Sequence, residues 1–314
     1  ERERWRRRAP AKVALSCRTG LAKLAMEVDC AVASSPRRSF PESSPTIPEF
    51  MADVSSPPAS GASPAAFATI DDVIAQLDVI IATARRRGSA DGYFAALYRR
   101  VTATVKTRIA QGAFADGPRM ARFDIAFANR YVGAWLQHER GETPTSAWSV
   151  ALSCGTSFWP VVMQHLLLGM NAHINLDLGI VAAEIAPGAA IQDLKNDFDA
   201  INQLLSDLVG DVQDRMGAIW PGVRILDRAG GGLDEDIVNF SLRRAREAAW
   251  GVATTLAAEP DAARRAVYIR GIDEVATLLG RGVLHPGFWA ASTLALVRLR
   301  ERGSVAEKLD VLLK

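Results

Sequence analysis

The sequence predicts an all-α protein, a single domain of about eight helices around a long, buried central helix. Apolar residues recur at helical spacing along most of the chain after residue 68. No run of alternating β-branched residues bounded by turn signals indicates a sheet. Residues 157–186 are apolar on nearly every side, which is typical of a helix in the middle of a domain.

The helices follow one another with short breaks. We expect them at about residues 69–87, 90–111, 118–138, 157–186, 191–216, 234–258, 261–279 and 288–300, with 146–154 leading into the central helix and 305–313 compatible with a further one. Thr69 begins a capping sequence, Thr-Ile-Asp-Asp, and Gly88 suits the end of that first helix. Pro118 and Pro160 suit first helical turns.

Residues 1–68 are predicted to be a disordered leader or non-native extension, and residues 69–314 the helical domain. The first fifty residues begin without Met, and Met51 resembles an authentic start. Arg and Ser in that segment would also suit a transit peptide, but its six acidic residues count against this alternative.

The composition and charge indicate which classes of protein are compatible with this sequence. The 314 residues include 49% hydrophobic and 23% charged residues, which is enough for a sizeable soluble core. Residues 1–50 hold ten Lys/Arg and six Asp/Glu, so the rest carries −2 of the net +2 and offers no basic face to nucleic acid. Only Cys154 belongs to the body, which suits a cytoplasmic location. No uninterrupted apolar run reaches the roughly 18 residues of a membrane span.

Polar side chains interrupt the central apolar run and need buried partners, because unpaired polar groups are costly to bury. They are Gln164, His165, Asn171, His173, Asn175, Asp177 and Glu184. At about 100° and 1.5 Å per residue, the histidines and acids share one flank and the amides occupy the other. His173 and Asp177 could chelate a cation or form a hydrogen-bonded dyad. His165, roughly 12 Å from His173 along the helix, is more typical of a core histidine than of a ligand.

Three interpretations of this pair stay open. One is a site for a single divalent metal ion, with His173, Asp177 and Asp197 as ligands and Zn, Fe or Mn fitting equally. Another is a metal-free catalytic pair, in which Asp124 and His165 would be further candidates. The third is a purely structural network of buried polar groups.

The third helix adds a second polar group, formed by Asp124, Asn129, Arg130 and Tyr131. Its last three residues, with Asn171 and Asn175, are candidates for substrate binding. An interhelical Asp–Arg pair is the structural alternative. Cys154 has no convincing local base and is expected to be packed. Arg243, Arg244 and Arg246 are expected at the surface or in salt bridges.

Four segments together resemble domain-of-unknown-function family 5995. They are RFDIAFANRY at 122–131, QHLLLGMNAHINLDLGI at 164–180, DFDAIN at 197–202 and AREAAW at 245–250, within a resemblance that covers about residues 70–299. It implies that the family's motif contains Asp124, Asn129, His165, Asn171, His173, Asn175, Asp177 and Asp197. It supplies no reaction.

Two functions are compatible with the sequence. The leading hypothesis is a small-molecule enzyme, with or without a metal ion, whose pocket lies beside His173 and Asp177 and is completed by Asp124 and Asp197. The alternative is a non-catalytic helical protein that binds a small apolar or amphipathic molecule or a protein partner. In that case the central polar residues serve only as a structural network.

Overall fold

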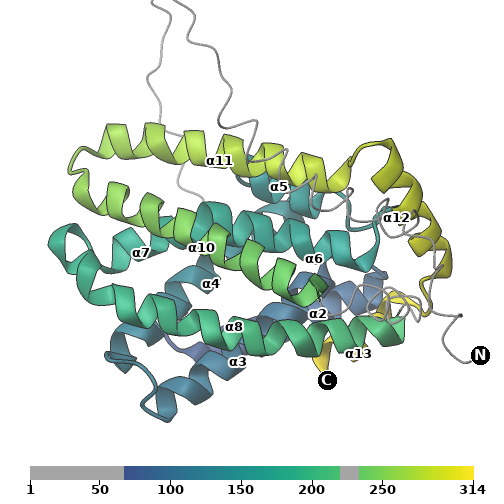
Figure 1. Ribbon diagram of the computed structural model, residues 1–314, viewed down its shortest axis with the longest axis horizontal. Coiled ribbons are helices and arrows are strands. Elements are labelled where there is room, and N and C mark those ends of the chain that lie inside the picture. Colours follow the sequence, from purple (N-terminus) through teal and green to yellow (C-terminus); the bar gives the residue numbers. More distant parts are fainter. Residues whose placement is uncertain (1–66, 220–232) are drawn as a thin grey trace, which may run out of the picture. The chain divides into compact units, whose positions relative to one another are not determined.

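A computed structural model of the chain describes residues 67–219 and 233–314, and every regular element in these ranges is a helix (Figure 1). The all-α prediction is confirmed. Of the described residues, 67–219, 233–287 and 291–314 belong to one compact unit. The predicted leader lies outside the described residues, apart from its last two positions.

The helices keep the predicted order. They are α2 (Ile70–Arg87), α3 (Gly92–Ala110), α4 (Gly117–Glu139), α5 (Ser146–Leu152), α6 (Val162–Asn171), the π-helix η1 (Ala172–Leu178), α7 (Gly179–Ile185), the 3-10 turn η2 (Gly188–Ala190), α8 (Ile191–Ile219), α10 (Leu233–Ala258), α11 (Ala262–Leu284), α12 (Phe288–Arg300) and α13 (Val305–Leu313). The caps of α2 are as predicted, with a capping box between Thr69 and Asp72 and a left-handed Gly88 at φ 66°.

The central helix begins later than predicted and is not α-helical throughout. It runs from Val162 to Ile185 as α6, η1 and α7 in continuous succession. Val161 is extended and its N–H donates to the Gln164 side chain, while Glu301, far along the chain, accepts from the N–H of Val162 at 2.9 Å. These bonds satisfy N–H groups that a helix start leaves without partners.

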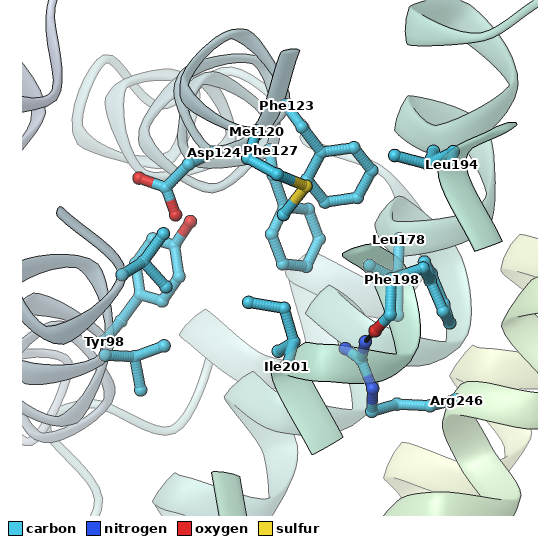
Figure 2. Close-up of a pocket in the computed structure, with 12 residues that line it drawn as sticks. Tyr98, Met120, Phe123, Asp124, Phe127, Leu178, Leu194, Phe198, Ile201 and Arg246 are labelled. Carbon is cyan, nitrogen blue, oxygen red and sulfur yellow. Dashed lines mark hydrogen bonds between the residues drawn. The ribbon is translucent and has the colours of Figure 1, made fainter. Parts of the chain in front are cut away.

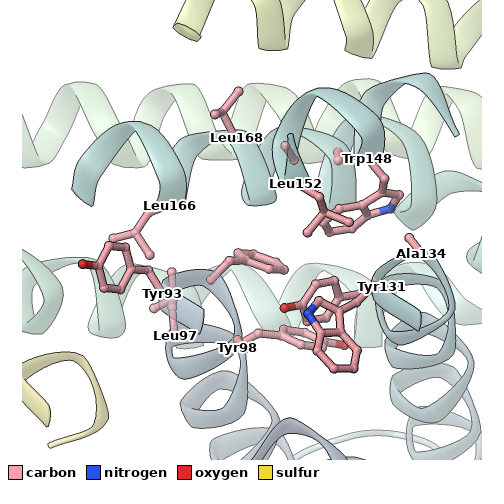
Figure 3. Packing of buried hydrophobic residues seen from close by; sticks show 14 of the residues in the cluster. Tyr93, Leu97, Tyr98, Tyr131, Ala134, Trp148, Leu152, Leu166 and Leu168 are labelled. Carbon is pink, nitrogen blue, oxygen red and sulfur yellow. The ribbon is translucent and has the colours of Figure 1, made fainter. Parts of the chain in front are cut away.

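The predicted central position of this helix is confirmed by its neighbours, since its three segments contact α3, α4, α5, α8, α10 and α11. Figure 3 shows how large side chains from α3, α4 and α5 pack together with Leu166 and Leu168 of the central helix. Gly179 permits a close approach of α10, since a Cβ there would lie 2.7 Å from the carbonyl oxygen of Ala249. By length and composition Val162–Ile185 could cross a membrane, but 72% of its most apolar window is buried inside the structure.

Candidate functional site

The central motif supplies two members of a buried polar network, the Asp177 network, which comprises Arg130, Trp148, His173 and Asp177. The Asp177 side chain is fully buried, at 0% exposure. Its Oδ1 accepts from Nε of Arg130 at 2.6 Å, and its Oδ2 accepts from Nε1 of Trp148 at 2.9 Å. Nδ1 of His173 lies 3.5 Å from the same Oδ2. The predicted His173–Asp177 pair is thus part of a larger network drawn from α4, α5 and η1.

Aromatic rings enclose the imidazole of His173. The rings belong to Phe94, Tyr98, Phe127, Tyr131 and Trp148. Phe127 stacks on it with centroids 3.5 Å apart and planes 11° from parallel. Burial lowers the pKa of His173, and the contact with Asp177 offsets only part of that effect. His173 is therefore held neutral, and its Nε2 has no hydrogen-bond partner within the described part of the chain.

The opposite flank of the central helix holds α11. Nδ2 of Asn171 donates to the carbonyl oxygen of Ala276 at 2.7 Å, and Nδ2 of Asn175 donates to Oδ1 of Asn171 at 2.9 Å. Nε2 of Gln164 donates to the carbonyl oxygen of Val283 at 2.8 Å. The predicted amide flank therefore exists. Of the two asparagines considered for substrate binding, Asn171 joins the central helix to α11, and Asn175 holds the side chain of Asn171.

His165 contacts Cys154 instead of joining His173. Its Nδ1 lies 3.6 Å from Sγ of Cys154, so the expectation that this cysteine has no nearby base is wrong, although it is packed as predicted. Burial raises the pKa of Cys154 to about 11 and lowers that of His165 to about 4. Both groups are kept neutral, which is the opposite of an activated thiolate.

Asp197 accepts hydrogen bonds from the start of α4 and the residues just before it. Its carboxylate accepts from the N–H groups of Ala115 and Asp116, at 2.6 and 3.1 Å, and from Nη2 of Arg119 at 2.8 Å. Among residues 67–219 and 233–314, no group of three or more His, Cys, Asp or Glu is arranged to hold a metal ion. The predicted ligand set of His173, Asp177 and Asp197 is therefore not assembled, and its residues do not fit such an ion.

The remaining candidate residues on α4 do not form one group, because each contacts a different part of the structure. Arg130 makes an interhelical pair, with Asp177. Tyr131 stacks on Trp148, with centroids 5.0 Å apart, and Oδ1 of Asn129 accepts from the N–H of Phe67 at 3.4 Å. Asp124 points elsewhere, into a cavity.

This cavity, the Asp124 cavity, has a volume of about 40 Å³. It is lined by Tyr98, Val101, Val105, Met120, Phe123, Asp124, Phe127, Leu178, Leu194, Phe198, Ile201 and Arg246 (Figure 2). The lining is mostly apolar. Phe127 separates it from the Asp177 network, because the ring that stacks on His173 also lines the cavity. Val101, Phe127 and Ile201 are only partly buried.

Asp124 is the acidic group of this cavity and is 5% exposed. Its Oδ2 finds no hydrogen-bond partner in the described residues, and burial raises its pKa to about 7. In Figure 2 the hydroxyl of Tyr98 points toward this carboxyl. Burial and then the charge of Asp124 raise the pKa of Tyr98, while the neighbouring hydroxyl of Thr102 opposes this rise. Neither hydroxyl makes a hydrogen bond of good geometry among the described residues.

Arg246 lies on another side of the cavity, and the sequence did not predict it there. Arg243 and Arg244 are exposed as expected, but Arg246 is buried. Its Nε donates to Oδ1 of Asn202 at 2.5 Å, its Nη2 donates to the carbonyl oxygen of Phe198 at 2.6 Å, and its guanidinium lies over the Phe198 ring. Burial lowers its pKa to about 10. The AREAAW segment that carries it was the only sequence signal.

Comparison with known proteins identifies the family. The sequence model described as "Family of unknown function (DUF5995)" matches residues 70–286. The chain belongs to this family. The matched range of this DUF5995 protein contains both the Asp177 network and the Asp124 cavity. No curated protein and no solved structure matches the chain.

Proposed function

We propose that this DUF5995 protein binds a small, mostly apolar molecule in the Asp124 cavity, with one hydroxyl or amino group of that molecule at Asp124. The observation that carries the proposal is a buried carboxyl whose Oδ2 lacks a partner in the described residues and which lines a mostly apolar cavity. Ligand sites are typically apolar with a few convergent polar groups. A buried polar atom without a partner costs free energy, and a ligand would recover it.

The size of the cavity limits what it accepts. A volume of about 40 Å³ exceeds that needed by one water molecule and suits the end of a small organic molecule. The rest of that molecule would extend past the partly buried lining residues Val101 and Ile201. In this proposal Asp124 and Tyr98 fix the orientation of the polar end.

The Asp177 network has a structural role in this proposal. Its carboxylate already accepts from two donors, and its imidazole is neutral and enclosed by rings. Groups with these properties support helix packing better than proton transfer to a substrate. We therefore favour the non-catalytic alternative over the enzyme with His173 as base.

The test is binding of simple probes to the full chain, followed by protein NMR. The probes are primary alcohols from methanol to butanol, the corresponding amines, and butyrate as a carboxylate of matched length. We expect an alcohol or amine to shift signals of the lining residues and butyrate to bind less well than either. Ile201→Phe should fill the space and abolish those shifts.

Two further variants make this test decisive. Asp124→Asn keeps the shape of the side chain and should change the preference between alcohol and amine. Val79→Phe, on the exposed surface of α2, should leave binding unchanged. Binding that is absent from the wild type, or equal in the wild type and Ile201→Phe, would reject the proposal.

A second candidate function rests on the pKa of Asp124. A carboxyl that titrates near 7 inside an apolar cavity is suited to general acid–base catalysis. In that case Asp124→Asn would retain probe binding but lose turnover of a substrate. Mass spectrometry of a small alcohol and amine library incubated with both proteins would show conversion by the wild type alone.

A further inference from the structure

Helix α11 carries an apolar strip on the side that faces away from the domain. Its inner face contacts α5, α6 and η1, and Ala276, Thr277 and Gly280 are buried there. At about 100° per residue, Val267, Gly271, Val275, Leu278 and Gly282 share the opposite side. All five are exposed, and Leu278 is 66% exposed. Figure 1 shows α11 at the upper edge of the described helices.

This strip differs from an ordinary solvated face. The outer side of a surface helix is usually polar. Here it carries Val267, Val275 and Leu278, with Gly271 between the two valines and Gly282 one turn after Leu278. A Cβ added at Gly271 or Gly282 would meet no atom within 4 Å. Another helix could therefore approach closely at these positions. Contiguous exposed apolar surface of this kind marks interaction sites.

The charges beside the strip point to its partner. Arg270 and Glu274 are exposed one turn apart on the same edge. When two copies of α11 cross antiparallel with the crossing centred at the level of Ile272, each Arg270 faces the Glu274 of the other copy. A parallel two-fold pair would instead put the two charged edges on opposite sides of the contact, where Arg270 and Glu274 do not meet. We propose that the outer face of α11 is a dimer interface, at which a second copy of this chain docks antiparallel.

The same arrangement gives Leu278 a place to pack. Counted from that centre, Leu278 lies at the level of Ala266 and Val267 of the other copy, both of which are exposed. A hollow of about 440 Å³ adjoins that position, lined in part by Leu256, Val267 and Tyr268. Arg281 of one copy would approach Arg264 of the other. Because Nη1 of Arg264 lies 3.5 Å from the carboxylate of Glu259, the charge that Arg281 meets is already paired. A helix of 23 residues is about 34 Å long, and one such contact suits a weak, concentration-dependent dimer.

Sedimentation velocity of the full chain over a wide concentration range tests this inference. We expect a monomer–dimer equilibrium that Leu278→Arg weakens by about tenfold or more. Arg270→Glu alone and Glu274→Arg alone should each weaken the dimer, because each places like charges opposite one another. The double reversal Arg270→Glu/Glu274→Arg should restore it. Val79→Arg, at an exposed apolar position of α2, is the matched control and should leave it unchanged.

Circular dichroism of each variant verifies that helix content is kept. A protein that stays monomeric at every concentration overturns the inference. So does a dimer whose dissociation constant is unaffected by Leu278→Arg, or one that the double reversal fails to restore. These outcomes do not depend on the Asp124 cavity, whose probes bind within one chain.

Discussion

Asp177 and Asp124 are both buried aspartates, but they differ in how completely their carboxyl oxygens are hydrogen-bonded. Asp177 accepts from a guanidinium and an indole, and its surroundings complete its hydrogen bonding. Asp124 keeps a carboxyl oxygen without a partner in the described residues, and its pKa is raised to about 7. Buried acids with complete partners fix helix positions, whereas an incomplete one beside a cavity is suited to receive a ligand. This difference between the two aspartates is the reason we propose the ligand site at Asp124.

Removing the satisfied acid should have the largest effect. We expect Asp177→Ala to cost about 3–5 kcal/mol of unfolding free energy, because it leaves the charge of Arg130 and the N–H of Trp148 without their partner. Urea denaturation measures this loss. Asp199→Ala, which removes an exposed pair with Lys195, is the control and should cost less than about 1 kcal/mol. Similar losses in the two variants would contradict a structural role for the Asp177 network.

Replacing the unsatisfied acid should have an effect that depends on pH. The carboxyl of Asp124 is protonated in both states well below its ordinary pKa of 3.8, but above pH 7 the folded protein holds a buried charge. Wild-type stability relative to Asp124→Asn should therefore fall as pH rises from about 4 to 7. A pKa raised from 3.8 to about 7 limits the difference to about 4 kcal/mol. Denaturation of both proteins across this range measures it, and a difference independent of pH would show that Asp124 titrates normally.

A smaller effect is expected at Gly169, beside the ring cage of His173. A Cβ there would lie 2.3 Å from the Phe94 ring, so Gly169→Ala must displace that ring. We expect a loss of about 1–3 kcal/mol by thermal or urea denaturation. Gly251→Ala, in α10, meets no atom within 4 Å and should instead stabilise the protein slightly. The account of a tightly packed cage fails if the two substitutions behave alike.

The smallest stability effect is expected at Tyr98. Its hydroxyl makes no hydrogen bond of good geometry among the described residues, so Tyr98→Phe should change the unfolding free energy by less than about 1 kcal/mol. It should nonetheless weaken binding of alcohol probes. Trp148→Phe removes the hydrogen bond to Asp177 and should cost more. Equal stability losses in the two variants would remove the distinction between the two sites.

The sequence predicted the features that depend on local spacing. Apolar periodicity located the helices, and the four-residue interval between His173 and Asp177 indicated their pairing. The π-helix at Ala172–Leu178 was not predicted. The side chains were placed on the two flanks by assuming 100° per residue throughout, and a π-helix has more residues per turn than an α-helix. Trp148 as a partner of Asp177 was also missed, since that contact depends on where α5 packs.

The Asp124 cavity could not be predicted, because its lining residues lie far apart in the sequence. Asp124 lies on α4, whereas Phe198 and Arg246 come from α8 and α10, and no spacing in the sequence relates them. The candidate Asp197 resembled a metal ligand by residue type alone. Its role in holding the start of α4 depends on the position of Ala115 and Asp116, far from it along the chain.

The most direct test of the central claim is an NMR titration of the Asp124 side-chain carboxyl, with and without butanol. The account predicts a pKa near 7 in the free protein and a displaced titration when the alcohol binds, because the ligand contacts the carboxyl. A pKa near the ordinary value of 3.8 that butanol leaves unchanged would contradict it.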